Sequence, residues 1–510
     1  MIRSNIWALV TLVTLYVLVD AVVNWNGARQ WAAARAELAR EGETLDMKEL
    51  TRVTADEGRN FCAIEPLRDL TVASDPRSPG GLRLAALLRE ALPSGGGSLK
   101  KPPSGEGPAF GTPADMRAWA TFVSESKYAV LPAGSEHPEQ DLLAAMDAAH
   151  PLLKQLAEAA PMRPDAAFVP PLPLSRPLFA VACPHFQAAN QTGPALALRA
   201  LAASAVGDHA AACQSIQAAL RLAVALRREP FLIGTLSACV VHSTAENSLW
   251  NLLEKRQLTE AELQAVQESL AALNFHDALL TAMRSELVAE IDTVEYLQGA
   301  ASEIPAFTSV LPTEGRESPP KSPLRYLWNL VPTGLFDENK TVLASLMLRE
   351  AIRPLKEPAL GPLLNRQSAF EQELKALQGP WHPHYFFARM LVPSIQRSVD
   401  RAAAEEALRL QGLTACALEH WYLQHHAYPA GLQDLVPALL PAVPADPIDG
   451  RPLRYRQTDD GRYMLWSIGL DQKDNEGRVN LSHLRLTTTS QPYRRSYEGD
   501  WVWQYTAVKR

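Results

Sequence analysis

Apolar residues follow two different spacings along this chain. Between residues 136 and 394 they recur every three to four positions, the spacing of one buried helix face. After residue 450 they alternate with polar residues, as they do along strands that bury one face. The pattern therefore predicts a mainly α-helical array that ends in a small α+β module with a short antiparallel sheet.

The clearest helical pattern covers residues 193–226. An apolar stripe ends at Gly207 and Asp208 and resumes beyond them, so the segment predicts a helix hairpin. In length and pattern it resembles a single tetratricopeptide-type hairpin, but no second copy follows at that period, so a repeat array is not established. Thr259 and Glu262, three residues apart before an apolar run, predict a capping box at the start of a further helix.

The first residues form a long apolar run. Only Asp20 interrupts it between Ile6 and Val23, and about 18 apolar residues are just enough for one membrane-spanning helix. A cleaved signal peptide or a buried soluble helix are the alternatives; "VNWNGARQ" is a poor cleavage site, which favours an uncleaved anchor. We expect a single-pass protein of the inner (cytoplasmic) membrane with the bulk of the chain extracytoplasmic.

Length and proline content divide the chain further. A chain of 510 residues is long for one domain, and 39 prolines indicate many connectors. The segment "PSGGGSLKKPPSGEGP", near 93–108, reads as a linker. We predict four parts: an anchor at 1–27, a helical and irregular segment at 28–135 that holds the linker, an α-helical body at 136–394, and an α+β module at 395–510.

The end of the chain predicts turns and strands. "RPLRYRQ" and "RYMLWSIG" alternate apolar and polar residues around Asp459, Asp460 and Gly461, as in a β-hairpin, and "DWVWQYTAV" adds a candidate third strand. Its aromatic residues suit a buried strand face better than an exposed binding stripe. Asp446 and Asp449 in "ADPIDGRP" are predicted to shape turns rather than to form an acid–base pair.

This ordered series of motifs resembles the globular part of the major pseudopilins of type II secretion. The similarity covers residues 413–477: a long helix, a Tyr-Pro pair, a small Leu-rich helix, an Asp-Pro-x-x-Gly turn, and a Ser-x-Gly-x-Asp segment. A pseudopilin carries its apolar helix directly before this part, whereas here it lies almost four hundred residues upstream. We therefore do not expect processing or polymerisation as a pilin. The whole chain resembles bacterial membrane-anchored proteins that carry this ending, on "DEGRNFCAIEPL" and "PTGLFDENK", and that resemblance brings no activity with it.

The resemblance implies a calcium site in the loop that follows. Asp471, Asp474 and Asn475 are the candidate ligands, because Ca²⁺ prefers several oxygen ligands. The family's glycine-rich continuation is degraded here to "GRVNLSH", so a solvated acidic turn is the alternative. Apart from this possible Ca²⁺, no cofactor is expected.

Composition excludes some functions. A net charge of −7 and an isoelectric point near 6.0 do not suit nucleic-acid binding. Five widely spaced cysteines predict free thiols, with one disulfide in an oxidising compartment as the alternative. Three Cys/His pairs in the helical region are weak zinc candidates. These pairs are Cys183 with His185, His209 with Cys213, and Cys239 with His242. No catalytic motif is recognisable.

Three functions remain open. The first is a membrane-anchored extracytoplasmic scaffold or partner-binding protein, whose pseudopilin-like module serves as a docking element. The alternatives are an extracytoplasmic enzyme with a dispersed site, and an accessory subunit of a type II secretion-like system. A pocket lined by carboxylates or histidines with shifted pKa values would favour an enzyme, and an exposed apolar groove would favour partner binding.

Overall fold

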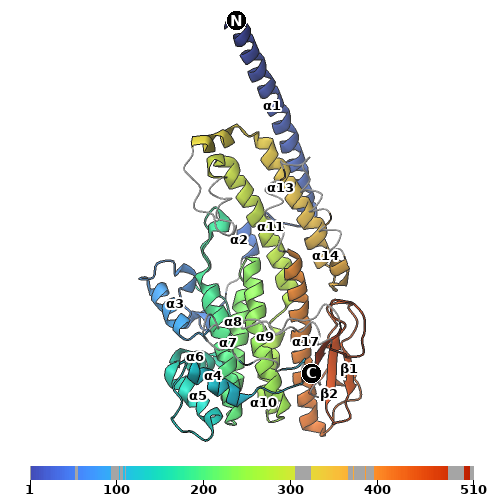
Figure 1. Cartoon of the computed structure of the whole chain (residues 1–510). Coiled ribbons are helices and arrows are strands. Elements are labelled where there is room, and N and C mark those ends of the chain that lie inside the picture. Colours follow the sequence, from blue (N-terminus) through green and yellow to red (C-terminus); the bar gives the residue numbers. More distant parts are fainter. Residues whose placement is uncertain are drawn as a thin grey trace.

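Helices dominate the computed structural model, and a short antiparallel sheet lies near the C-terminal end (Figure 1). The structure describes residues 2–51, 55–93, 103, 107–109, 111–304, 323–365, 372, 385, 395–479 and 499–505. The predicted fold class is therefore confirmed. The linker predicted near 93–108 falls largely outside the described residues.

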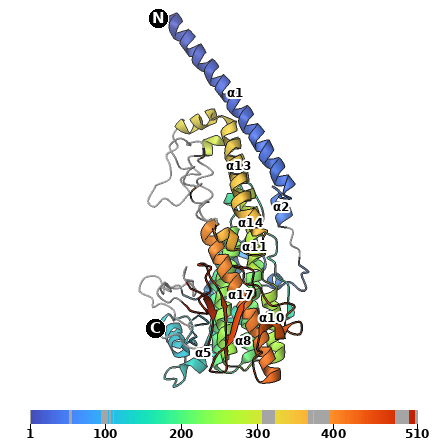
Figure 2. The same ribbon diagram turned by 90° about the vertical axis from the view of Figure 1, so that its right-hand side faces the viewer.

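Helix α1 (Ile2–Arg40) has an exposed first part and a second part that packs on the body. Its first part is exposed and extends away from the body, whereas Trp31, Ala34 and Leu38 are buried against α13 (Thr333–Met347) and its neighbours (Figures 1 and 2). Among the described residues, the stretch Ile6–Arg40 is long and apolar enough to cross a membrane. A signal sequence would show the same length and composition.

Long antiparallel helices form the body and bury most of its apolar residues in one cluster. Many of the buried residues are alanines, so neighbouring helices approach each other closely. Shorter helices cover one side of these long helices (Figure 1). The long helices are α7 (Pro184–Ala205), α8 (His209–Arg227), α9 (Leu232–Glu254), α10 (Glu260–Ala271), α11 (Phe275–Gly299) and α17 (Ile395–His425); the shorter ones are α3 (Pro79–Arg89), α4 (Met116–Glu125), α5 (Pro138–Ala149) and α6 (Pro151–Ala159).

The predicted helix hairpin and capping box are both present. Helices α7 and α8 meet at Gly207, whose φ of 80° is a conformation that glycine adopts without strain, and Asp208 then caps α8. At the start of α10 the Thr259 hydroxyl accepts a hydrogen bond from the Glu262 amide, while the Glu262 carboxylate accepts one from the Thr259 amide. Both features are encoded locally, which is why the sequence pattern located them.

Three antiparallel strands in the order β1-β2-β3 form the sheet beside α17 (Figures 1 and 2). β1 (Arg454–Gln457) pairs with β2 (Tyr463–Ser467) through the predicted turn, and β2 pairs with β3 (Trp501–Trp503). Trp501 and Trp503 are buried, so β3 packs into the fold and presents no exposed aromatic stripe. The predicted sheet is confirmed.

Asp446 and Asp449 form the predicted turns and also hold the sheet. The Asp446 carboxylate accepts hydrogen bonds from the backbone amides of Ile448 and Ile468, and Asp449 accepts one from the Arg451 amide. Both carboxylates in addition pair with Arg454 on β1, at 2.7 Å and 2.6 Å. Their oxygens are thus used in tying the turn to two strands.

The sheet shares its core with the helical body. Tyr463 and Trp503 belong to the same apolar cluster as Trp250 of α9, and the Trp250 indole donates a hydrogen bond to the backbone oxygen of Gln504 at 3.0 Å. The domain boundary drawn at residue 395 stays a prediction, and the packing of the core continues across it.

Charged side chains are buried where α9 meets α17. His242 lies 2.7 Å from Glu405 and 3.2 Å from Glu246, and all three side chains are almost completely buried. Burial alone would lower the pKa of His242, but the two carboxylates outweigh it and raise the pKa to about 9. The imidazole is therefore a buried cation between two carboxylates. One turn away, Arg409 pairs with Glu406.

Candidate functional site

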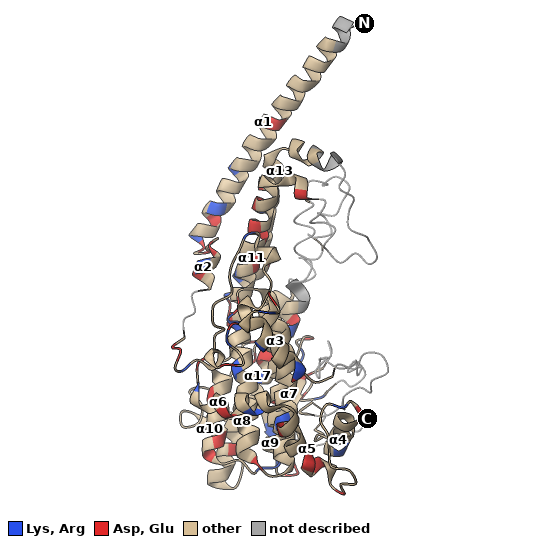
Figure 3. Ribbon diagram, turned by 90° about the vertical axis from the view of Figure 1, so that its left-hand side faces the viewer, with Lys and Arg blue, Asp and Glu red and all other residues tan. Residues whose placement is uncertain are grey.

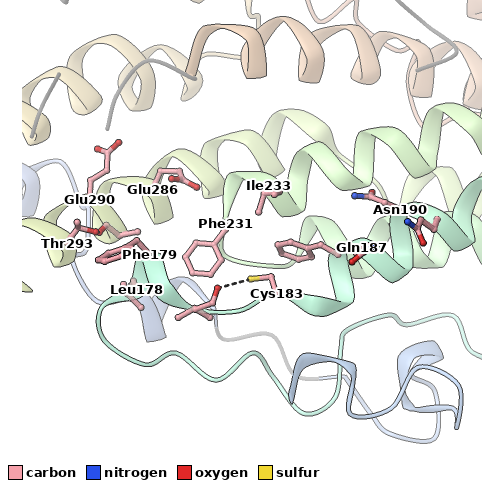
Figure 4. A pocket seen from close by; sticks show the side chains of 14 residues that line it. Leu178, Phe179, Cys183, Gln187, Asn190, Phe231, Ile233, Glu286, Glu290 and Thr293 are labelled. Atoms are coloured by element: carbon pink, nitrogen blue, oxygen red, sulfur yellow. Dashed lines mark hydrogen bonds between the residues drawn. The ribbon is translucent and has the colours of Figure 1, made fainter. Parts of the chain in front are cut away.

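A cavity of about 730 Å³ opens in the side of the helical body, next to α11. Figure 4 shows Glu286, Glu290 and Thr293 on one helix, Gln187 and Asn190 on another, and Phe231 between them. A cavity of this size, apolar with a few polar groups, is typical of a small-ligand or side-chain binding site. We treat it as the candidate functional site.

The wall opposite α11 is the segment that leads into α7, which includes a short 3-10 helix, Leu178–Ala180. Asp292 of α11 fixes this segment, because its carboxylate accepts a hydrogen bond from the Leu178 amide at 2.8 Å and pairs with Arg176. The segment places Phe179 and Cys183 at the cavity. Its position therefore depends on a contact between residues more than a hundred positions apart.

Glu286 joins the cavity to the start of α9. Its carboxylate accepts a hydrogen bond from the Leu232 backbone amide at 2.8 Å. The N-cap residue of α9, Phe231, makes no side-chain capping bond, so Glu286 provides an acceptor for the first turn of this helix. Burial raises the pKa of Glu286, and the hydrogen bond from Leu232 opposes that rise only in part. Glu286 thus contributes to the structure and also lines the cavity.

Glu290 has no comparable partner. It lies one helical turn after Glu286, its side chain is buried, and its Oε2 atom has no hydrogen-bond partner among the described residues. Burial and the nearby Glu286 raise the pKa of Glu290 well above the usual range of a carboxyl group. No lysine, arginine or histidine is among the described residues that line the cavity. A positively charged group in the cavity would meet two carboxyl groups and no competing cation.

Aromatic and aliphatic side chains form the rest of the wall. Phe186 and Phe231 lie inside, whereas Phe179 and Ile233 are 44% and 56% exposed, as expected at the mouth of a cavity. The Cys183 thiol is directed at the Val181 carbonyl oxygen at 3.6 Å, and burial raises its pKa to about 12. A thiol with so high a pKa is a poor nucleophile at neutral pH. The cavity can therefore bind a ligand, and Cys183 does not supply a reactive thiolate.

The structure brings the predicted calcium ligands only partly together. The Asn475 side-chain amide donates a hydrogen bond to Asp471 at 3.3 Å. Asp474 instead accepts a hydrogen bond from the Trp466 indole at 2.9 Å and pairs with Arg454 at 3.5 Å. Asp500, which the sequence did not single out, joins them from a distant position. Its two carboxylate oxygens accept hydrogen bonds from the backbone amides of Asn475 and Gly477, one each.

The oxygens of this loop already accept hydrogen bonds from the protein itself. Asp471 accepts hydrogen bonds from the backbone amides of Lys473 and Gly499, in addition to the one from the Asn475 side chain. In the parts of the chain that the structure describes, no three His, Cys, Asp or Glu residues are grouped so as to hold a metal ion, and this includes the three Cys/His pairs considered for zinc. All five cysteines are free. Calcium at Asp471, Asp474 and Asn475 stays a prediction.

Thermal unfolding of the full chain in detergent tests that prediction. If the loop binds Ca²⁺, calcium in hundredfold excess over its Kd is expected to stabilise the native state by about 2.7 kcal/mol relative to chelator, and Asp471→Asn should remove the difference. Asp459→Asn, in the exposed hairpin turn, is the matched control and should leave it unchanged. An unfolding temperature that is equal with calcium and with chelator would exclude the site.

Sequence reasoning missed the cavity. Glu286 and Glu290 stand four positions apart in the helical pattern "SELVAEIDTVE", which places them on one face of a helix among apolar residues. Two acidic residues on a face that is otherwise apolar were the available signal. What the spacing did not reveal is that the segment before α7 lies against this face.

Comparisons with protein families, with curated proteins and with solved structures found no match to this chain.

Proposed function

We propose that this protein is a membrane-anchored extracytoplasmic binding protein. Its cavity would receive a positively charged group on an apolar stem, in the simplest case a lysine side chain of a partner protein. The observation that supports this most directly is Glu290, a buried carboxyl group with one oxygen unpaired among the described residues, in a cavity whose described lining contains no lysine, arginine or histidine. The anchor would be α1, on the length and apolar composition of its first part.

The chemistry of the cavity suits such a group. The methylenes of a lysine stem would contact Phe186 and Phe231, and the ammonium would pair with Glu286 and Glu290. An aromatic ring face attracts a cation, and a charge-assisted hydrogen bond contributes about 1.5–3 kcal/mol. Binding would lower the pKa of Glu290 and release a proton, so binding is expected to strengthen as the pH rises through that pKa.

A calorimetric titration with hexylammonium, a small mimic of the lysine side chain, tests the cavity. Glu290→Gln keeps the size of the side chain but cannot ionise when the ligand binds, so it should weaken hexylammonium binding at least about tenfold, which corresponds to 1.4 kcal/mol. Neutral hexanol should bind both proteins equally.

Glu295→Gln is the matched control, because Glu295 lies on the same helix, is partly exposed, and pairs with Arg176 outside the cavity. Equal affinity of the Glu290→Gln and unchanged proteins for hexylammonium would contradict the proposal.

An enzyme is the second candidate, because two carboxyl groups with raised pKa values in an apolar cavity are also the material of acid–base catalysis. The geometry favours binding. Glu286 and Glu290 project from one face of one helix and so approach a ligand from the same side, whereas carboxyl pairs in hydrolases of the two-carboxylate type flank the reacting bond.

The resemblance of the C-terminal module to pseudopilins supports a protein partner as well. On this resemblance, the module would serve as a docking element. An accessory role in a type II secretion-like system is a further proposal. Co-purification of the full chain with secretion-platform proteins would support that role, and its absence from such complexes would count against it.

A further inference from the structure

A short helix, Pro323–Leu330, reaches the apolar part of α1 with its C-terminal end, at the end of the body from which α1 emerges (Figures 1 and 2). The Tyr16 hydroxyl donates a hydrogen bond to the Leu330 carbonyl oxygen at 2.7 Å, although 314 residues separate the two in sequence. The short helix is therefore level with the interior of the apolar run of α1, not with its end.

Three side chains described on this short helix are large, apolar or aromatic, and exposed, and the polar Asn329 beside them is exposed as well. Tyr326 is 54% exposed, Trp328 37% and Leu330 58%. In water such side chains are unfavourable, at roughly 25 cal/mol for each Å² of apolar surface. Tyrosine and tryptophan are enriched where a membrane meets water, because each combines an apolar ring with a polar group.

The depth of the contact can be read from α1. Tyr16 precedes Val23, the last residue of the apolar run, by seven positions, or roughly 10 Å along a helix axis. Helices that lie in a membrane surface bury their apolar side about 5–10 Å into the boundary between headgroups and acyl chains. If α1 spans the bilayer, a helix end at the level of Tyr16 therefore lies at about this depth. Figure 3 shows one acidic turn near the middle of α1 and no other charged residue between it and the grey N-terminal end.

Asp20 and Asn24 of α1, near this level, pair with each other and with α13, which lowers the cost of burying them in lipid. The Asn24 side chain donates to Asp20 at 2.9 Å and accepts the Gly334 amide at 2.7 Å. Gly27 and Gly334 let the two helices touch, since a Cβ atom at either position would lie within 2.2 Å of a backbone oxygen. This contact fixes α13, and with it the short helix that precedes α13, against α1.

We infer that Tyr326, Trp328 and Leu330 form a second membrane contact of this protein, inserted into the leaflet on the side of the body beside the anchor helix. The inference rests on the proposed membrane anchoring by α1. With two contacts the body cannot turn freely about the anchor, so the cavity beside α11 stays at a set height and orientation above the membrane.

Spin labels on the full chain in phosphatidylcholine vesicles test this contact. The labels are placed by Trp328→Cys, by Leu12→Cys in the anchor, and by Val130→Cys, 89% exposed in the body, all in a Cys183→Ser background. We measure collision of each label with oxygen, which is concentrated in lipid, and with a water-soluble nickel chelate. The label at 328 is expected to collide with nickel several-fold less than the label at 130, and more with oxygen.

The label at Leu12 separates the two ways in which this can fail. If the label at 12 lies in lipid while the label at 328 collides freely with nickel, the second contact is wrong and the anchor stands. If the label at 12 itself is in water, the proposed anchoring is wrong. A label at 328 that is shielded from both oxygen and nickel would indicate a protein partner or a second copy of this chain on the surface, which overturns the lipid contact.

Discussion

Replacing His242 by alanine is expected to lower the free energy of unfolding by about 3–5 kcal/mol, because it leaves the buried Glu246 without its paired cation and Glu405 with Arg401 alone, at 3.5 Å. His242 lies 2.7 Å from Glu405 and 3.2 Å from Glu246, and no solvent reaches any of the three to replace the lost charge. Denaturant unfolding of the full chain, followed by circular dichroism, measures the change.

The pH dependence of stability gives the same test a second readout. The pKa of His242 is raised from 6.5 in the unfolded chain to about 9 in the fold. Its contribution is therefore complete below about pH 6.5 and is lost as the pH rises to 9 and beyond. The unchanged protein should lose stability over that window more steeply than His242→Ala.

His420→Ala is the matched control for this prediction. His420 is also on α17, and its partner Glu260, at 3.3 Å, is more than half exposed. An exposed pair of this kind contributes about 0–1 kcal/mol. Equal losses for the two variants would show that the buried charges between α9 and α17 are not a main source of stability.

The second large effect is expected at the contact of α1 with α13. Gly334→Ala places a Cβ atom 2.1 Å from the Val23 carbonyl oxygen, where the obstacle is backbone and cannot rotate away. Overpacking costs about 1–3 kcal/mol, and occasionally more when the backbone has to shift. The variant should also lose the hydrogen bond from the Gly334 amide to Asn24. We therefore expect a lower free energy of unfolding and a loosened α1.

Gly299→Ala provides the control, because a Cβ atom at Gly299, at the end of α11, would meet nothing within 4 Å. That variant should be neutral or slightly stabilising. Nitroxide distances between α1 and α13 add a structural readout, since Gly334→Ala should broaden them. An unchanged free energy of unfolding together with unchanged distances would refute the close contact.

Local patterns allowed much of the fold to be predicted from the sequence. The capping box at Thr259, the break at Gly207 and the hairpin around Gly461 each depend on residues within a few positions of one another. Such features are readable because propensity, capping and turn geometry all operate over short distances.

The cavity and the buried charges could not be predicted in this way. His242 and Glu405 are 163 positions apart, and Leu178 and Asp292 are 114 apart. Nothing in either local pattern shows that the helices concerned are neighbours. Asp500 illustrates the same limit in the predicted calcium loop, where a carboxylate arrives from a position after β2 that the local motif does not contain.

The last described residues bear on how the chain reaches its final form. The Gln504 side chain donates a hydrogen bond to the Ala109 carbonyl oxygen at 2.9 Å. The Gln504 backbone amide donates a second one to the Pro108 carbonyl oxygen. The hydrogen bond to Ala109 joins positions 395 residues apart, and contacts of such long sequence separation form late in folding. Because β3 also completes the core around Trp250, the fold closes only after the chain has been synthesised beyond β3. Until then the exposed apolar surface would need protection, for instance by a chaperone.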